Sequence, residues 1–247
     1  MRLITLNCWG GKERMRDLLL DFVRREGAAT DFLCLQEVDH EGTGKFPFVD
    51  EDPELFGKFA DILPDHTGYF HPHFRDFFGL GAFVRTSVPV MKAEERFVHL
   101  HKGFEPEGDI GHRARHLQVI TCEMGGKTFS VINFHGLWNG QGKGDSSDRL
   151  EQSRKIVEAL KFLKGEIVLC GDFNLEPDTE SMAIIEAAGL RNLVKEYGVT
   201  STRTSLYTKP GKFADYILVS KGIKVKNFRV LPDEVSDHAP LMLEFEV

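Results

Sequence analysis

The chain has 247 residues, of which 41% are hydrophobic and 28% are charged, and its formal net charge is −7. This length allows one large domain or two small ones, and the composition is that of an ordinary soluble globular protein. The acidic balance argues against a protein that coats nucleic acid non-specifically, because such binding draws on many Lys and Arg contacts to phosphate.

The cysteine spacing and the N-terminal residues together favour a cytoplasmic protein with reduced thiols. Four cysteines are present, they are widely spaced, and no C-x-x-C pair occurs. We therefore expect buried, reduced thiols rather than a zinc ribbon or a dithiol redox site. The N-terminal residues run into a strand pattern without a signal-peptide core, and no run of eighteen apolar residues occurs. We expect a soluble, cytoplasmic monomer without a stable membrane anchor.

The first forty residues predict a strand, a helix and a second strand. Residues 2–6 alternate as a strand that ends at Asn7, and apolar side chains recur at helical spacing over 13–25. The second strand, over 32–37, ends at Glu37. A strand that is buried on both faces should not end in a carboxylate unless something outside the sheet requires the charge.

The middle of the chain is rich in strand patterns. Residues 40–66 are turn-rich and give no clear element, and Gly42-Thr43-Gly44-Lys45 lacks the spacing of a phosphate loop, so we expect a surface loop there. Five strand patterns follow, with a Gly-Gly hairpin signal before the last, and their succession favours antiparallel pairing. They cover residues 68–70, 80–85, 90–100, 117–124 and 128–133.

Aromatic and histidine side chains in this region have two interpretations. The aromatic residues between Tyr69 and Phe78 can line a substrate groove, but a chain with 20 Phe residues favours core and rim packing. Three histidine pairs have metal-ligand spacing, yet no cluster of acids accompanies them, which favours surface or structural histidines. These pairs are His71/His73, His99/His101 and His112/His116.

The tetrapeptide Gly171-Asp172-Phe173-Asn174 follows a short buried strand over 167–170. One interpretation is a simple turn, because Gly, Asp and Asn are common turn formers. The other is a site at the rim of a sheet, where a glycine lets a ligand approach an acid and an amide together. Before this strand, a strand ending at His135 leads into a glycine-rich connection, which we expect to be mobile, and then into a helix from Ser147.

The last part of the chain adds a helix over 180–188, strands over 213–219 and 225–231, and a closing strand over 241–245. Polar residues now stand at six strand ends or turns. Together they supply oxygen ligands for Mg²⁺, a carboxylate to orient water, amides for phosphate oxygens and a histidine that can carry charge. They are Asn7, Glu37, His135, Asp172 with Asn174, Asp215, and Asp237 with His238.

Four segments resemble the signature blocks of the endonuclease/exonuclease/phosphatase superfamily, which includes pancreatic-type deoxyribonuclease and the apurinic endonucleases. They follow the family order and span nearly the whole chain: Leu33-Cys34-Leu35-Gln36-Glu37-Val38, Gly171-Asp172-Phe173-Asn174, Asp215-Tyr216-Ile217-Leu218 and Ser236-Asp237-His238-Ala239-Pro240. The resemblance implies one α/β domain over residues 1–247, built as a four-layer α-β-β-α sandwich. Two mixed, mostly antiparallel sheets pack face to face with helices outside, and the site lies at one end.

The resemblance also implies roles for the metal-binding residues. Glu37 is expected to be the principal ligand of Mg²⁺ or Mn²⁺, with Asn7 beside it. Asp237 is expected at or near the same metal.

The remaining residues are expected to act on the phosphate and on water. By the same resemblance, Asp172 orients and deprotonates the attacking water, and Asn174 holds a non-bridging phosphate oxygen. Asp215 accepts a hydrogen bond from His238 and favours an imidazolium that stabilises the transition state. His135 donates to phosphate or to the leaving group.

The chain departs from the apurinic endonucleases at two places. It keeps Asn7 but lacks the acid that they place two positions later, and His135 stands where they have a tyrosine. These differences weaken a DNA-repair assignment. Weaker candidates for substrate contact are Asn139, Arg113, Arg115 and Lys143, since isolated basic residues in loops are more often plain surface.

The expected function is a Mg²⁺- or Mn²⁺-dependent phosphodiesterase, with nucleases among the options, that uses in-line attack of activated water. A phosphomonoesterase or a sphingomyelinase-like enzyme would use the same chemistry. A non-catalytic binding protein that keeps the fold is the alternative from another class. The substrate, whether nucleic acid, lipid or small molecule, is expected to be selected by loops at 40–66, 71–79, 101–116 and 136–147.

Overall fold

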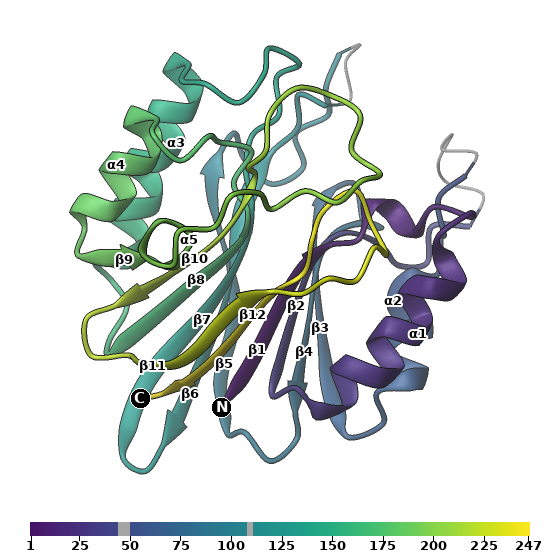
Figure 1. The fold of residues 1–247 in the computed structure, drawn as a ribbon, viewed down its shortest axis with the longest axis horizontal. Helices are drawn as coiled ribbons and strands as arrows, with labels where there is room; N and C mark the ends of the chain where they lie inside the picture. Colours follow the sequence, from purple (N-terminus) through teal and green to yellow (C-terminus); the bar gives the residue numbers. More distant parts are fainter. Residues whose placement is uncertain (44–49, 108–110) are drawn as a thin grey trace.

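The computed structural model describes residues 1–43, 50–107 and 111–247, and it contains two six-stranded mixed sheets (Figure 1). The first sheet has the strand order β11-β12-β1-β2-β4-β3. Its strands are β1 (Arg2–Asn7), β2 (Phe32–Asp39), β3 (His66–Phe74), β4 (Phe78–Arg85), β11 (Lys224–Val230) and β12 (Leu241–Glu246). Only β1 and β2 pair in parallel, because an intervening helix returns the chain to the same end of the sheet.

The second sheet has the order β5-β6-β7-β8-β10-β9, and only β7 and β8 in it are parallel. Its strands are β5 (Val90–His99), β6 (Arg115–Met124), β7 (Lys127–His135), β8 (Glu166–Asp172), β9 (Leu190–Asn192) and β10 (Asp215–Ser220). The inner faces of the two sheets share one apolar core, in which Phe32 of β2 packs edge-on against Phe129 of β7.

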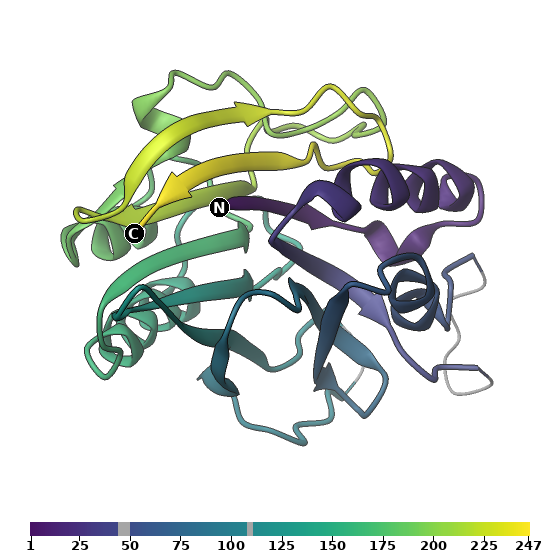
Figure 2. The ribbon, with the colours of Figure 1, turned by 90° about the horizontal axis from the view of Figure 1, so that it is seen from below.

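Helices cover the two outer faces, with α1 and α2 on one side of the molecule and α3 and α4 on the other (Figures 1 and 2). Apolar stripes of α1 (Arg16–Glu26) and α2 (Leu55–Ile62) pack on the first sheet. On the second sheet, Ser146 caps α3 (Ser147–Leu160) and Thr179 caps α4 (Glu180–Ala187) through side-chain oxygens. A short helix, α5 (Leu193–Glu196), follows β9. The predicted four-layer sandwich is confirmed.

Three local predictions differ from the structure. The unassigned segment 40–66 contains α2, whose Leu55, Phe56 and Phe59 form the buried face. The expected loop over 71–79 is largely the ends of the β3–β4 hairpin, and Pro72 is tolerated there because β3 is an edge strand. Strand β9 and helix α5 were not predicted, because three or four residues carry too little periodicity. The predicted surface loop over 42–45 lies partly outside the described residues.

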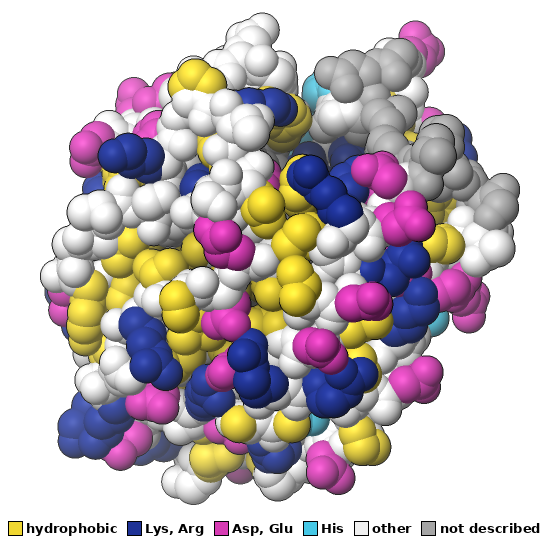
Figure 3. Space-filling view, turned by 45° about the vertical axis from the view of Figure 1, so that its right-hand side comes forward, with side chains coloured by type: hydrophobic (Ala, Val, Ile, Leu, Met, Phe, Trp, Pro, Cys, Tyr) yellow, Lys and Arg dark blue, Asp and Glu magenta, His cyan; other side chains and the backbone are white. Residues whose placement is uncertain are grey.

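The four cysteine thiols are buried and free, as expected for reduced thiols. Within the described ranges, no helix is both long and apolar enough to cross a membrane. The face drawn in Figure 3 intersperses Lys and Arg with Asp and Glu side chains, so charges of both signs share this surface.

A buried network of three amide side chains joins the two sheets. Gln36 Nε2 of β2 donates to Asn133 Oδ1 of β7 at 2.6 Å, and Asn133 Nδ2 donates to the Leu35 carbonyl at 3.0 Å. Asn133 Nδ2 also donates to Gln118 Oε1 of β6 at 2.9 Å. All three amides are at most 1% exposed, so each bond replaces one to water that is no longer possible. The network therefore fixes the relative position of the sheets.

Replacement of Asn133 by alanine should destabilise the fold strongly. The change leaves the Gln36 and Gln118 amides and the Leu35 carbonyl short of partners inside the core, which predicts a loss of about 2–4 kcal/mol in the free energy of unfolding. Urea unfolding followed by circular dichroism measures this loss. Asn227→Ala, on edge strand β11, is the control and should change stability by less than about 1 kcal/mol. An Asn133→Ala loss as small as the control's would contradict a structural role for the network.

Candidate active site

The topology brings the predicted polar residues to one end of the sandwich, the upper end in Figure 1. Asn7 pairs with Gln36 at the carboxyl ends of parallel β1 and β2, and His135 pairs with Asp172 at the ends of β7 and β8. Antiparallel β10 begins at this end, which places Asp215 opposite Asp172. Carboxyl ends of adjacent parallel strands share one edge of a sheet, so residues distant in sequence meet there.

Asp172 lies at the centre of the group. Its Oδ1 accepts the Asn174 backbone N–H at 2.8 Å, and its Oδ2 accepts from Asn7 Nδ2 at 3.0 Å. The Nε2 atoms of His135 and His238 lie 3.7 and 3.6 Å from the same Oδ2. The carboxylate is 1% exposed, and two fixed donors therefore hold it facing both imidazoles.

Asp215 and His238 form a buried pair. His238 Nδ1 lies 2.9 Å from both carboxylate oxygens of Asp215, which fixes the tautomer with Nδ1–H and leaves Nε2 facing Asp172. Burial raises the pKa of Asp215, and burial together with the nearby Arg203 charge lowers the pKa of His238. The protein alone thus favours a neutral imidazole, and an imidazolium requires added negative charge in the site.

Glu37 owes its position to a bulge. The pairing of β2 with β4 shifts between Leu35 and Val38, and Glu37 has a φ of 54°, in the left-handed region that a glutamate rarely adopts. The bulge turns its side chain to the cavity, where Oε1 lies 3.7 Å from His135 Nε2. A strained residue at a strand end is typical of a site that uses the side chain.

The carboxylates fit a divalent metal. Burial and then the Glu51 charge raise the pKa of Glu37, and burial raises that of Asp237, whose Oδ1 finds no hydrogen-bond partner within the described parts of the chain. Partly buried oxygen anions that repel one another are a donor set that Mg²⁺ or Mn²⁺ would neutralise.

A second arrangement of possible ligands overlaps the first. Ligand atoms of Asp172, Asp215 and His238 lie within 4.8 Å of one another. In this trio the Asp215 carboxylate and His238 Nδ1 already satisfy each other, and a histidine nitrogen suits softer metals than Mg²⁺. Carboxylate oxygens of Glu37 and Asp237, which also line the cavity, are the ligand type that a hard cation prefers.

Close backbone approach explains the glycines beside Asp172. Gly171 has a φ of 135°, and a Cβ there would lie 2.0 Å from the Phe134 carbonyl oxygen. A Cβ on Gly136 would lie 2.2 Å from the Phe173 carbonyl oxygen. Asn174 also has a positive φ, of 53°. The turn interpretation of the tetrapeptide and the site interpretation thus describe the same residues, because the turn presents the acid and the amide.

A cavity of about 220 Å³ opens beside Asp172. Of the predicted residues, Asn7 and Asp215 contact the site from behind without lining it. Asn139 does not line the cavity either, and its Oδ1 accepts the Gln141 N–H at 3.1 Å. The predicted residues that line the cavity are Glu37, Arg113, Arg115, His135, Lys143, Asp172, Asn174, Asp237 and His238.

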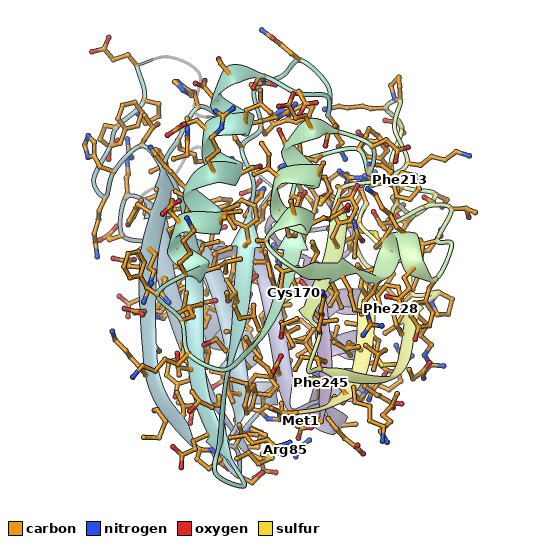
Figure 4. All side chains as sticks on the ribbon, turned by 90° about the vertical axis from the view of Figure 1, so that its left-hand side faces the viewer. Met1, Arg85, Cys170, Phe213, Phe228 and Phe245 are labelled. Atoms are coloured by element: carbon orange, nitrogen blue, oxygen red, sulfur yellow. The ribbon has the colours of Figure 1, made fainter. Side chains whose placement is uncertain are left out.

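The basic candidates are not plain surface. Arg113, Arg115 and Lys143 are 8%, 1% and 6% exposed, and all three line the cavity. Lys143 Nζ donates to the Phe213 carbonyl at 2.8 Å, and Phe213 lies at the site end of the molecule, opposite Met1 and Phe245 (Figure 4).

Two of the histidines expected to be surface or structural residues are buried. His73 and His116 are buried, and neither ring nitrogen of His116 has a partner among the residues that the structure describes.

Sequence reasoning missed several lining residues. Arg203 is the most informative, because its Nη1 lies 3.2 Å from Asp237 Oδ2 and its guanidinium carbon lies 4.0 Å from the centre of the Tyr207 ring. Arg203 lies in a polar segment that contains no strand. Its single antiparallel β-bridge to His238 cannot be recognised from the sequence. The other missed residues are Trp9, Lys12, Glu51, Gly111, Trp138, Tyr207 and Lys209.

Comparisons with known proteins agree with this geometry. The chain is 29% identical over 120 residues to a UPF0294 protein of Vibrio campbellii, which covers 49% of this chain and 40% of that protein. The chain thus spans less than half the length of this curated relative.

Two solved structures share the fold across the whole chain. A mannosyl-6-phosphatase of Bacteroides thetaiotaomicron has a TM-score of 0.77 at 16% identity, with both chains fully covered. The human Nocturnin catalytic domain with bound sulfate has a TM-score of 0.68 at 19% identity and is covered to 94%.

The sequence profile of one family matches residues 4–238, which includes every strand end described above. The sequence blocks, the four layers and the converging strand ends all agree with that match. The chain belongs to the endonuclease/exonuclease/phosphatase family.

Proposed function

We propose that the chain is a Mg²⁺- or Mn²⁺-dependent hydrolase of phosphate esters, which acts by in-line attack of water activated by Asp172. The observation that carries the proposal is the convergence on one carboxylate oxygen, Asp172 Oδ2, of Asn7 at 3.0 Å, His238 at 3.6 Å and His135 at 3.7 Å. A diester is the class that the sequence favours. Asp172 and His238 would act on water and phosphoryl oxygens, which monoesters and diesters share.

Each residue has a task that follows from its contacts. Asp172 is held by the Asn174 N–H and by Asn7, so it can orient a water and accept its proton without moving. His238 directs Nε2 into the cavity because Asp215 fixes Nδ1. Negative charge on a bound phosphate would favour its protonation, and the resulting imidazolium would stabilise the transition state.

Other residues position the phosphate. Burial and then the Arg115 charge lower the pKa of His135, so its neutral ring donates or accepts a hydrogen bond without a formal charge. Asn174 holds its amide at the cavity wall, with Nδ2 3.3 Å from the Gly136 carbonyl. Glu37 and Asp237 would hold the metal ion, which would neutralise phosphoryl charge when bound.

Asp172→Asn should lower kcat by about a hundredfold or more, because an amide cannot take the proton of the attacking water. Steady-state hydrolysis of bis-p-nitrophenyl phosphate and p-nitrophenyl phosphate with Mg²⁺ or Mn²⁺ measures the effect. Asp17→Asn, on the exposed face of α1, is the matched control and should keep the wild-type rate. Wild-type rates in Asp172→Asn would refute the assigned base, and metal binding without turnover of any phosphoester would favour a non-catalytic protein.

Metal binding should be visible without turnover. Saturating Mg²⁺ or Mn²⁺ should raise the melting temperature by about 5 °C, since the ion binds only the folded carboxylates. Glu37→Gln should melt higher than the wild type without metal, because a buried repulsive charge is removed, and should lose most of the metal-induced shift.

Differential scanning fluorimetry against a metal titration tests both statements. Glu123→Gln on the exposed face of β6 serves as control and should respond to metal as the wild type does. A full metal shift in Glu37→Gln would show that Glu37 is not a principal ligand.

A further inference from the structure

The cavity is richer in positive charge than the chain as a whole. Among the described residues that line it, six are Lys or Arg and four are Asp or Glu, an excess of two positive charges in a chain of net charge −7. A divalent metal would increase this excess. The site is therefore built for a ligand of high negative charge density. The six cationic residues are Lys12, Arg113, Arg115, Lys143, Arg203 and Lys209.

Lys12 and Arg203 form ion pairs with carboxylates, which neutralise their positive charge. Lys12 Nζ lies 3.0 Å from Asp50 and 3.2 Å from Glu51, and Arg203 lies 3.2 Å from Asp237. Ion pairs of this kind position the carboxylates and leave little net charge for a ligand.

Arg115 is different, because its only polar partner in the described structure is neutral. Its side chain is 1% exposed, Nη1 lies 3.2 Å from His73 Nε2, and Nε has no hydrogen-bond partner among the described residues. Burial and then the Arg115 charge lower the pKa of His73 well below its usual value, so the ring accepts this bond as a neutral group. His73 therefore orients the guanidinium without cancelling its charge.

Lys143 repeats this arrangement at the other side of Asp172. Its ammonium donates to the Phe213 carbonyl at 2.8 Å, next to the start of β10, and no carboxylate of the described chain pairs with it. Burial lowers the pKa of Arg115 to about 9 and that of Lys143 to about 8. In the strand order, β6 with Arg115 and β10 with the Lys143 anchor lie on either side of β8, which ends in Asp172.

Burying a cation without an anion costs several kcal/mol, and an anion inside the cavity would offset that cost. A phosphodiester carries one negative charge, whereas a terminal phosphate carries about 1.5 to 2 near neutral pH. Arg115 and Lys143, two cations beside the centre whose hydrogen-bond partners are neutral, match the second kind of group. We propose that Arg115 and Lys143 bind a doubly charged terminal phosphate. Because the site is also the proposed hydrolase site, on which this step rests, the substrate is then a compact phosphomonoester.

The size of the cavity and the outer surface favour the same substrate. A volume of about 220 Å³ suits a phosphate and a small alcohol, and Trp9, Trp138 and Tyr207 provide flat walls for the alcohol part. On the one side of the sandwich that Figure 3 draws, charges of both signs are mixed and form no single-sign track of the kind along which a nucleic-acid backbone is held. In the reaction, water oxygen joins phosphorus, the ester P–O bond breaks, and the leaving alcohol takes a proton, which yields alcohol and inorganic phosphate.

Binding of matched anions tests the proposal without turnover. Calorimetry on the metal-free protein compares inorganic phosphate at pH 8 with dimethyl phosphate, a singly charged diester. We expect phosphate to bind at least about tenfold more tightly, and Arg115→Met to weaken phosphate by about tenfold or more with little effect on dimethyl phosphate. Arg191→Met, an exposed arginine paired with Glu196, is the control and should bind as the wild type does.

Hydrolysis provides the second readout. With metal, the wild type should have a higher kcat/KM for p-nitrophenyl phosphate than for bis-p-nitrophenyl phosphate, and Arg115→Met should lower that ratio by about tenfold. Circular dichroism checks the fold of each variant. If Arg115→Met does not fold, Lys143→Met replaces it and should lower the ratio in the same direction.

The outcomes separate this proposal from the proposed hydrolase function. Preference of the wild type for the diester, or equal loss on both esters in folded variants, would overturn the monoester assignment and leave metal-dependent hydrolysis intact. If the wild type hydrolysed no phosphoester, or hydrolysed it no faster than Asp172→Asn does, the hydrolase function would be refuted. Tight phosphate binding that depends on Arg115 would in that case still support the anion site.

Discussion

The amide network between the sheets is the constraint on which the site depends. Glu37 comes from the first sheet, whereas His135 and Asp172 come from the second, so their separation is set by how the sheets pack. Apolar packing alone tolerates sliding and repacking, because it is not directional. Directional bonds from Gln36 to Asn133, one residue before Glu37 and two before His135, remove that freedom at the place where it matters.

Backbone strain is concentrated at the same end of the sandwich. Of the non-glycine residues with positive φ, Trp9, Glu37 and Asn174 line the cavity. Gly171 and Gly136 permit approaches that a Cβ would block. Regular strands would alternate these side chains between faces, and the bulge and the left-handed residues instead turn them toward one point. The strain is tolerated because the buried strands on either side hold the chain in place.

The sequence predicted the centre of the site better than its walls, for a physical reason. Glu37, Asp172 and Asp215 each interrupt a run of apolar strand residues. A charge at the end of a buried strand conflicts with burial, so such residues can be recognised from the sequence alone. Parallel strands then carry such ends to the same edge. The four-layer order could be predicted from the family blocks, whereas α2 was missed because the turn-rich segment before it obscured a short apolar stripe.

The walls depend on contacts that have no local signature. Arg203 reaches Asp237 across 34 residues of sequence, and nothing in its neighbours distinguishes it from a surface arginine. Arg115 and Lys143 were expected on the surface because charged residues in loops usually are. Their burial follows from the shape of the cavity, which only the assembled sheets and the connections after β7 and before β10 define.

The partners of the cations separate two uses of positive charge in one cavity. A carboxylate partner, as for Arg203 with Asp237, fixes the acid and neutralises the base. A neutral partner, as His73 is for Arg115 and the Phe213 carbonyl is for Lys143, fixes the cation and keeps its charge. A buried charge is costly unless an opposite charge lies near it, so a cation with a neutral partner favours the binding of an anionic ligand. A residue that does not contact phosphate can therefore set the specificity for phosphate charge. A neutral histidine at position 73 leaves the charge of Arg115 available to the ligand, whereas an acid there would neutralise it.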